Sequence, residues 1–382
     1  MLNLYNSSSN KEIYLLIEKY YNKGIEKNYT LGGIMNKPEK LNRGDKVALV
    51  SLSWGALGDD NFRHKYDIAK KRLLDEFGLE LVDMPHALSG TDYVLNHPED
   101  RAKDLMEAFS NPSYKAIFCA IGGNDTIRIL PYIDFDVIRN NPKIFMGYSD
   151  TTINHFMMHK ADLVSFYGPT VMCEFGEYVK MFDYTKDAVN RILFDNTPNF
   201  EIKPSPLWCN EFVSWDIKNI NKEKHLIPDT HGYELLQGSG VVTGPLLGGC
   251  LEALPMAFNT PIWPNDWDGK ILLLETSDDK PSPDEVYNIL NTLGEMDIYN
   301  QIQGIIVGKP YEEMYYEEYK DVIKKVLKEF NKPDLPVLYN INIGHAFPNG
   351  ILPLGTEVTI DFDNKRIFLS EQCLVDDKVK RI

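Results

Sequence analysis

Cysteine is scarce in this chain, and its placement excludes two classes of protein. The sequence holds five cysteines in 382 residues, an odd number with no CxxC pair. A disulfide-stabilised scaffold or a zinc cluster needs thiols that are paired or closely spaced. We therefore expect reduced thiols and no zinc cluster.

Long apolar runs and positive charge are lacking as well. No run reaches the about 18 apolar residues of a membrane-spanning helix, and no basic segment with an apolar core opens the chain. Asp and Glu number 56 against 40 Lys and Arg, so the formal net charge is −16. Such a charge repels polyanions. These features predict a cytoplasmic protein that binds neither nucleic acid nor a membrane.

The sequence does contain a regular alternation of strand and helix patterns. Apolar runs of strand length occupy residues 46–53, 79–84 and 114–123, and helical periodicity fills 62–77 and 98–109 between them. This alternation predicts parallel strands joined by crossover helices. Ligands of such sheets gather beyond the carboxyl ends of the strands.

The length and the change of pattern along the chain predict two domains of an α/β protein. We expect an N-terminal parallel-sheet α/β domain over residues 35–200 and a β-rich C-terminal domain over 241–382. Residues 201–240, with prolines and two tryptophans, read as a linker and a functional loop. Residues 1–34 read as an N-terminal extension: a dimer arm, an appended helix or an upstream segment without a role.

Ser149 lies at the most informative position. In KIFMGYSDTTINHF, residues 143–156, an apolar strand precedes it and helical spacing begins at Thr151. A serine on such a strand-to-helix turn has an exposed hydroxyl, and the helix N-terminus offers free N–H groups to a developing negative charge. The alternative is that Ser149 or Asp150 only caps the helix.

Three further positions fit acyl-transfer chemistry. Gly122-Gly123 closes an apolar strand and forms either a simple turn or a backbone N–H donor that faces Ser149. Glu275 ends the apolar run KILLLET and is either an orienting acid or an exposed loop residue. His345, in a loop between two glycines, is either a general base or a surface residue.

Two other pairs of residues invite a binding role. His155 and His159 share one helix face, but no third candidate ligand lies at a spacing that is typical of metal sites, so we predict no metal site. Trp208 and Trp215 lie in the polar segment 201–240, and both packing and stacking on an aromatic ligand suit them equally.

Four motifs, taken in order, resemble a known family. IGGNDTIRILPYID, GYSDTT, LLLET and GHAFPNGILPLG are similar to those of the LD-carboxypeptidase family of serine peptidases, which includes muramoyl-tetrapeptide carboxypeptidases and microcin C immunity peptidases. The similarity runs from about Met35 to the C-terminus.

The resemblance implies a Ser-Glu-His triad. Ser149 is the expected nucleophile, His345 the base and then the acid, and Glu275 the residue that orients the imidazole. Backbone N–H groups of Gly123 and Asp150 are the expected oxyanion donors. The resemblance also implies a site between the two domains, a homodimer, and neither a metal nor an organic cofactor.

The substrate is less closely defined by these motifs. The tryptophan-bearing insert is more similar to the microcin-immunity branch, which implies a small peptide or peptidyl-nucleotide substrate. Trp208 or Trp215 is then expected to stack on the nucleobase, and Gly122 and Asn124 are expected to bind the substrate as well. Murein tetrapeptide, trimmed of D-alanine, is the alternative, although Ile121-Gly122-Gly123-Asn124 departs from the Arg-Gly-Gly-Tyr turn of that branch.

Two readings from outside this mechanism stay open. One is a catalytically silent ligand-binding protein that uses the same cleft. The other is an ordinary α/β-hydrolase, against which Thr151 stands in place of the second glycine of GxSxG.

Overall fold

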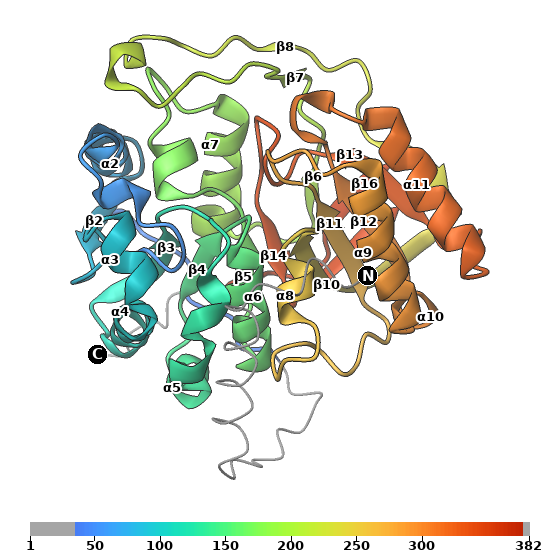
Figure 1. The fold of residues 1–382 in the computed structure, drawn as a ribbon, viewed down its shortest axis with the longest axis horizontal. Helices are drawn as coiled ribbons and strands as arrows, with labels where there is room; N and C mark the ends of the chain where they lie inside the picture. Colours follow the sequence, from blue (N-terminus) through green and yellow to red (C-terminus); the bar gives the residue numbers. More distant parts are fainter. Residues whose placement is uncertain (1–34, 377–382) are drawn as a thin grey trace.

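The protein is built on two β-sheets that lie beside each other. The computed structural model describes residues 35–376. One sheet comes largely from the blue-to-green part of the chain and the other from the gold-to-red part (Figure 1). The expected extension, residues 1–34, lies outside the described residues.

The first sheet has six strands in the order β14-β5-β4-β3-β1-β2. Its five N-terminal strands are parallel, and β14 pairs antiparallel with β5. Short, mostly apolar segments with almost completely buried side chains suit strands covered on both faces. The strands are β1 (Lys46–Val50), β2 (Glu80–Asp83), β3 (Tyr114–Cys119), β4 (Ile144–Gly147), β5 (Ser165–Tyr167) and β14 (Leu352–Leu354).

Helices cross between these strands, as the alternation predicts. The predicted helix over 62–77 is present and ends at Gly78, whose φ of 69° gives the left-handed cap that glycine favours. The α-helices are α2 (Arg63–Arg72), α3 (Thr91–Asn96), α4 (Pro98–Ser110), α5 (Phe135–Asn140), α6 (Thr151–Lys160) and α7 (Asp183–Val189). π-helical turns occupy Leu73–Phe77, Val171–Phe175 and Asn190–Asp195, and 3-10 turns occupy Ala56–Gly58 and Thr126–Tyr132.

The second sheet has eight strands in the order β6-β16-β15-β10-β11-β12-β13-β9. Its centre, β10 to β13, is parallel, and the outer pairs are antiparallel. The strands are β6 (Phe200–Ile202), β9 (Glu234–Gln237), β10 (Val241–Cys250), β11 (Ile271–Glu275), β12 (Gly304–Gly308), β13 (Val337–Ile341), β15 (Glu357–Asp361) and β16 (Arg366–Leu369).

Four α-helices accompany the second sheet, and α9 packs against α11. A capping box formed by Ser282 and Glu285 begins α9. The helices are α8 (Leu254–Ala257), α9 (Pro283–Glu295), α10 (Ile298–Gln301) and α11 (Tyr316–Glu329), and a 3-10 turn occupies Tyr311–Glu313. The predicted fold class, a parallel-sheet α/β unit followed by a strand-rich unit, is confirmed.

The chain crosses between the two sheets more than once. β14 completes the first sheet although it lies between β13 and β15 of the second sheet in the chain, and β6 joins the second sheet although it follows α7. Within the segment 201–240, β7 (Leu207–Trp208) and β8 (Ile227–Pro228) form a separate two-stranded ribbon and Ile217–Asn219 a 3-10 turn. The ribbon runs along the top edge of the molecule in Figure 1.

The sheets meet closely where β4, β5, β10 and β11 end. Helix α6 contacts β10 and α8 of the second unit. At Gly249 a Cβ atom would collide with Thr152 and would lie 2.8 Å from the Tyr167 ring, so only glycine allows this approach. The carboxyl ends of strands from both sheets therefore face one space.

The described part of the chain can be compared with the expectations about cysteines and about long apolar helices. All five cysteines fall within it, and they are free and buried. A search of its helices for one long and apolar enough to cross a bilayer finds none.

Candidate active site

Ser149 sits on a strained turn between β4 and α6. Its φ is 66°, a left-handed conformation that costs a non-glycine residue about 1–2 kcal/mol. A Cβ at Gly122 would lie 2.7 Å from the Ser149 Oγ, so the neighbouring turn must be glycine for the hydroxyl to fit. Strain of this kind persists where the surrounding structure holds it, and here it exposes the hydroxyl to the cavity.

Glu275 and His345 form a buried acid–base pair. Glu275 ends β11 with no exposed surface, and the Nδ1 atom of His345 lies 2.8 Å from its Oε2. Because an ionised carboxylate only accepts, Nδ1–H is the donor and Nε2 is left to act as a base. Gly344, with a φ of 80°, is required here because a Cβ would overlap the Glu275 carboxyl group.

The electrostatics of this pair favour a charged imidazole. Burial alone would lower the pKa of His345, but the attraction of Glu275, supported by Asp278, raises that pKa to about 9. Asp278 Oδ1 lies 3.8 Å from the Nε2 atom of His345. The imidazole is therefore protonated at neutral pH in the free protein.

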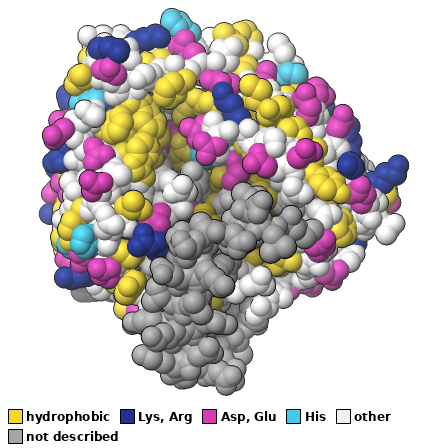
Figure 2. Space-filling view, viewed as in Figure 1, with side chains coloured by type: hydrophobic (Ala, Val, Ile, Leu, Met, Phe, Trp, Pro, Cys, Tyr) yellow, Lys and Arg dark blue, Asp and Glu magenta, His cyan; other side chains and the backbone are white. Residues whose placement is uncertain are grey.

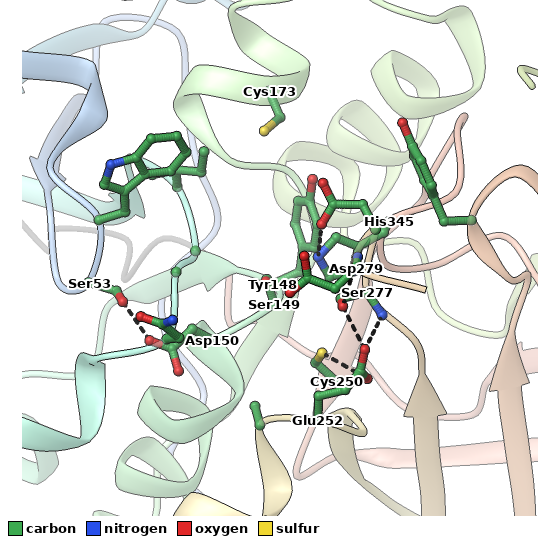
Figure 3. Close-up of a pocket in the computed structure, with 18 of the residues that line it drawn as sticks. Ser53, Tyr148, Ser149, Asp150, Cys173, Cys250, Glu252, Ser277, Asp279 and His345 are labelled. Carbon is green, nitrogen blue, oxygen red and sulfur yellow. Dashed lines mark hydrogen bonds and ion pairs between the residues drawn. The ribbon is translucent and has the colours of Figure 1, made fainter. Parts of the chain in front are cut away.

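Ser149 and His345 line one cavity of about 550 Å³ between the two sheets. Figure 3 shows them together with Tyr148, whose ring meets the His345 imidazole edge-on at 5.0 Å. Within residues 35–376 no hydrogen bond joins Ser149 Oγ to His345. The structure thus brings Ser149 and the Glu275–His345 pair to one space without a hydrogen bond between Ser149 and His345, an arrangement that is common in active sites before a substrate binds.

Two backbone N–H groups beside Ser149 are available to an anion. Neither Gly123 N–H nor Asp150 N–H donates a hydrogen bond to any residue between 35 and 376. Asp150 is the N-cap of α6, where a free N–H is expected, and Gly123 has a φ of 141°. Both residues line the cavity, so both N–H groups are next to the space that a ligand would fill.

The side chain of Asp150 ties three strand ends together. Its Oδ2 accepts hydrogen bonds from Ser53 Oγ at 2.6 Å, Asp125 N at 2.9 Å and Thr126 N at 2.8 Å. Ser53 follows β1, and Asp125 and Thr126 follow β3. Figure 3 shows the contact between Ser53 and Asp150. This carboxylate holds the Gly122-Gly123 turn against the serine turn.

The two tryptophans of segment 201–240 have different surroundings. Trp215 lines the cavity, and its ring lies 6.3 Å from that of Trp54 with the planes inclined at 35°. Trp208 is buried outside the cavity, and the Lys309 Nζ atom lies 4.2 Å from its ring centroid. The structure therefore brings Trp215, Gly122 and Asn124 to the cavity and leaves Trp208 in packing contacts.

Acidic groups surround the His345 end of the cavity. Glu252, Asp278 and Asp279 line it, and Figure 2 shows acidic side chains beside apolar ones near the middle of this face. Burial raises the pKa of Glu252, whose Oε1 accepts from Ser277 N and Oγ at 2.9 and 2.6 Å. The cavity-lining lysine, Lys224, is paired with Glu177 at 2.7 Å.

Metal ligation has little support among the described residues. His155 uses both ring nitrogens in hydrogen bonds, to Ser165 Oγ at 2.8 Å and Gly147 O at 2.9 Å. Ligand atoms of Cys250, Glu275 and His345 lie within 4.8 Å of one another. Two of these three groups already bond each other, however, because His345 Nδ1 donates to Glu275 Oε2 at 2.8 Å.

Sequence reasoning missed three residues of this region. Trp54, Glu252 and Tyr167 lie near the ends of β1, β10 and β5. The rule that ligands gather at the carboxyl ends of strands was the signal that could have found them. It does not say which of the many residues near such ends point inward.

Comparison with known proteins agrees with this geometry. The sequence matches the LD-carboxypeptidase N-terminal domain over residues 47–168 and the LD-carboxypeptidase C-terminal domain over residues 243–360. The chain belongs to the LD-carboxypeptidase family. The resemblance seen in the four motifs is thus confirmed, and this family member is a peptidase.

Relatives of this LD-carboxypeptidase family member carry two kinds of name. The microcin C7 self-immunity protein MccF of Escherichia coli is 32% identical over 73% of this chain and 80% of its own. A probable murein peptide carboxypeptidase of Bacillus subtilis is 29% identical over 86% and 92%. The crystal structure of an MccF-like protein from Streptococcus pneumoniae in complex with AMP superposes with a TM-score of 0.79, at 36% identity over 85% and 98% of the two chains.

The charge state of His345 is directly measurable. We expect its imidazole to titrate near pH 9, and Asp278→Asn to lower that pKa because a negative charge 3.8 Å from Nε2 is lost. Asp284→Asn, in the exposed first turn of α9, is the matched control and leaves the titration in place. NMR titration of the histidine ring protons tests this, and a pKa near 6.5 in the unmodified protein would contradict it.

Proposed function

We propose that this family member is a serine-type carboxypeptidase that hydrolyses a terminal amide through an acyl-enzyme on Ser149. The observation that carries the proposal is one cavity lined by a serine on a strained turn, by two free N–H donors beside it and by His345, which is paired with the buried Glu275. These are the parts of a nucleophile, an oxyanion site and an oriented base.

The proposed nucleophile, base and oxyanion donors each act at a defined step of the reaction. The protonated His345 first releases its Nε2 proton to solvent. Ser149 Oγ then attacks the carbonyl carbon of the scissile amide while the neutral His345 Nε2 accepts the hydroxyl proton. The tetrahedral oxyanion receives hydrogen bonds from Gly123 N–H and Asp150 N–H. The C–N bond then breaks as imidazolium returns the proton to the leaving nitrogen, and water hydrolyses the ester by the same route. Glu275 stays ionised and balances the imidazolium.

Ser149→Ala should abolish hydrolysis while leaving the fold intact. Removal of a triad nucleophile lowers kcat/KM by about 10⁴-fold or more. Ser113→Ala, at an exposed serine in the turn before β3, is the matched control and should retain full activity. Product release from an aminoacyl sulfamoyl adenosine, followed by mass spectrometry, measures both.

The same experiment separates the enzyme from a silent binding protein. A mass increment on the peptide that contains Ser149, trapped at short times, identifies the acyl-enzyme. Binding without turnover or any such adduct would favour the binding protein, and full activity of Ser149→Ala would remove the proposal.

We further propose that the substrate is a peptidyl or aminoacyl nucleotide. The cavity has an aromatic wall made by Trp54 and Trp215, with Phe212 6.3 Å from Trp215, and this wall offers stacking surface to a base. A solved structure of an MccF-like relative contains AMP. Of the two tryptophans in segment 201–240, Trp215 rather than Trp208 is the proposed contact.

Trp215→Ala should weaken AMP binding selectively. Base stacking on an aromatic side chain is worth about 1–3 kcal/mol, so the Kd should rise about 5- to 150-fold. Trp215→Phe should restore most of the affinity, and Trp208→Ala should leave it unchanged in protein that stays folded. Calorimetric titration with AMP tests this, and equal losses in both alanine variants would contradict the assignment.

A second candidate function is favoured by the acidic end of the cavity. Glu252, Asp278 and Asp279 surround it, so an acyl group that carries an amine is attracted and one that carries a carboxylate is repelled. A peptide with a diamino acid in the acyl position presents such an amine. Removal of D-alanine from murein tetrapeptide is the alternative, and one relative is named as a probable murein peptide carboxypeptidase.

A substrate panel distinguishes the two candidates and tests the charge argument. Lysyl sulfamoyl adenosine should be hydrolysed about tenfold or more faster in kcat/KM than the glutamyl compound, equivalent to about 1.4 kcal/mol. Glu252→Gln should reduce this preference, whereas Glu318→Gln, in the exposed first turn of α11, should not. Release of D-alanine from the tetrapeptide alone would favour the murein role, and a preference for glutamyl would contradict the charge argument.

The proposal also includes a cytoplasmic homodimer. Five free, buried cysteines are compatible with a reducing compartment. Sedimentation of the full chain tests the dimer.

A further inference from the structure

The backbone of Ser149 is held by two hydroxyl groups. Its N–H donates to the Tyr167 Oη at 3.1 Å, and its carbonyl oxygen accepts from the Thr152 Oγ1 at 2.7 Å. Tyr167 ends β5 and Thr152 is in the first turn of α6, so both belong to the first sheet and its helices. Both side chains are fully buried.

Each of these hydroxyls has its other partner in the second sheet. Tyr167 Oη donates to the Glu275 Oε1 at 2.6 Å, and Thr152 Oγ1 accepts from the Cys250 backbone N–H at 2.9 Å. Glu275 ends β11 and Cys250 ends β10, two adjacent strands. Two hydroxyl bridges therefore join the nucleophile of one sheet to the acid-bearing strands of the other.

The direction of the bonds at Tyr167 follows from donor chemistry. A phenol has one hydrogen, Ser149 N–H only donates, and an ionised carboxylate only accepts, so the phenolic hydrogen points to Glu275. Burial raises the pKa of Tyr167 well above its ordinary value, which keeps that hydrogen in place. A hydrogen bond to a buried charge is among the stronger kinds.

These contacts define the rotation of the Glu275 carboxyl group. Its Oε2 accepts from His345 Nδ1 at 2.8 Å and from the His345 backbone N–H at 3.4 Å, and its Oε1 accepts from Tyr167 Oη at 2.6 Å. Each oxygen thus faces a different residue. Neither Tyr167 nor Thr152 lines the cavity. They do not contact a substrate in the cavity and can affect it only by positioning Ser149, Glu275 and His345.

We propose that Tyr167 and Thr152 are positioning residues of this active site, two hydroxyl bridges that hold Ser149 in register with the Glu275–His345 pair across the junction of the sheets. The effect on catalysis rests on the proposed function, whereas the effect on His345 does not. Misplacement of reacting groups by about 1 Å lowers rates by about 10²-fold.

Tyr167→Phe tests the first bridge. It keeps the ring that packs on Gly249 and leaves the buried Glu275 Oε1 without a donor, so the carboxylate turns or takes up a proton and attracts the imidazole less. We expect the His345 pKa to fall from about 9 by NMR titration. With the best aminoacyl sulfamoyl adenosine of the panel, kcat should fall about 10- to 100-fold with KM within about twofold.

The control is Tyr299→Phe, which removes another buried phenol hydroxyl, one in α10 that is bonded to Leu290 O at 2.7 Å and does not line the cavity. It should cost similar stability and leave both readouts unchanged. Identical His345 titration and kcat in the Tyr167→Phe and Tyr299→Phe variants would overturn the proposal for Tyr167.

Thr152 provides an independent pair of variants. Thr152→Val removes the hydroxyl at constant shape and should lower kcat about 10-fold or more, whereas Thr152→Ser keeps the hydroxyl and should restore it. Equal kcat in both would overturn the second bridge. If no substrate is turned over, the His345 titration of the Tyr167→Phe variant still tests the first bridge, so its failure and that of the proposed function are distinguishable.

Discussion

The burial of one carboxylate, Glu275, is the constraint on which the rest of the site depends. A charged group with no exposed surface needs partners close by, because its lost hydration is otherwise uncompensated. His345 satisfies one oxygen from a loop of the second unit, and Tyr167 satisfies the other from the first sheet. Glu275, the acid of the proposed triad, thus also links the two sheets through its hydrogen bonds.

The loop that carries His345 is anchored on both sides of this junction. It leaves β13 in the second sheet and ends at β14, where Leu352 pairs with Tyr167 on the edge of the first sheet. Since β14 crosses to the other sheet, a displacement of either sheet also moves the histidine loop. The path of the chain and the hydrogen bonds of Glu275 therefore restrain the same geometry.

The two ends of the cavity differ in chemistry. One end has aromatic side chains, Trp54 and Trp215, and the other has carboxylates beside His345, among them Glu252. Some relatives are named for microcin immunity and others for murein peptides. The side chains that line the two ends of the cavity are where members of one family can differ while they keep the same fold.

The sequence by itself determined the alternation of strands and helices, the family and the place of Ser149 on a turn, because these depend on local periodicity and on residues close together in the chain. Only the tertiary structure decided that Trp215 lines the cavity while Trp208 packs under Lys309, since both stand in similar local sequence. It alone also decided that Tyr167 and Thr152 bridge the sheets. Such contacts join residues about 100 positions apart, and a periodic pattern carries no information on which distant groups will meet.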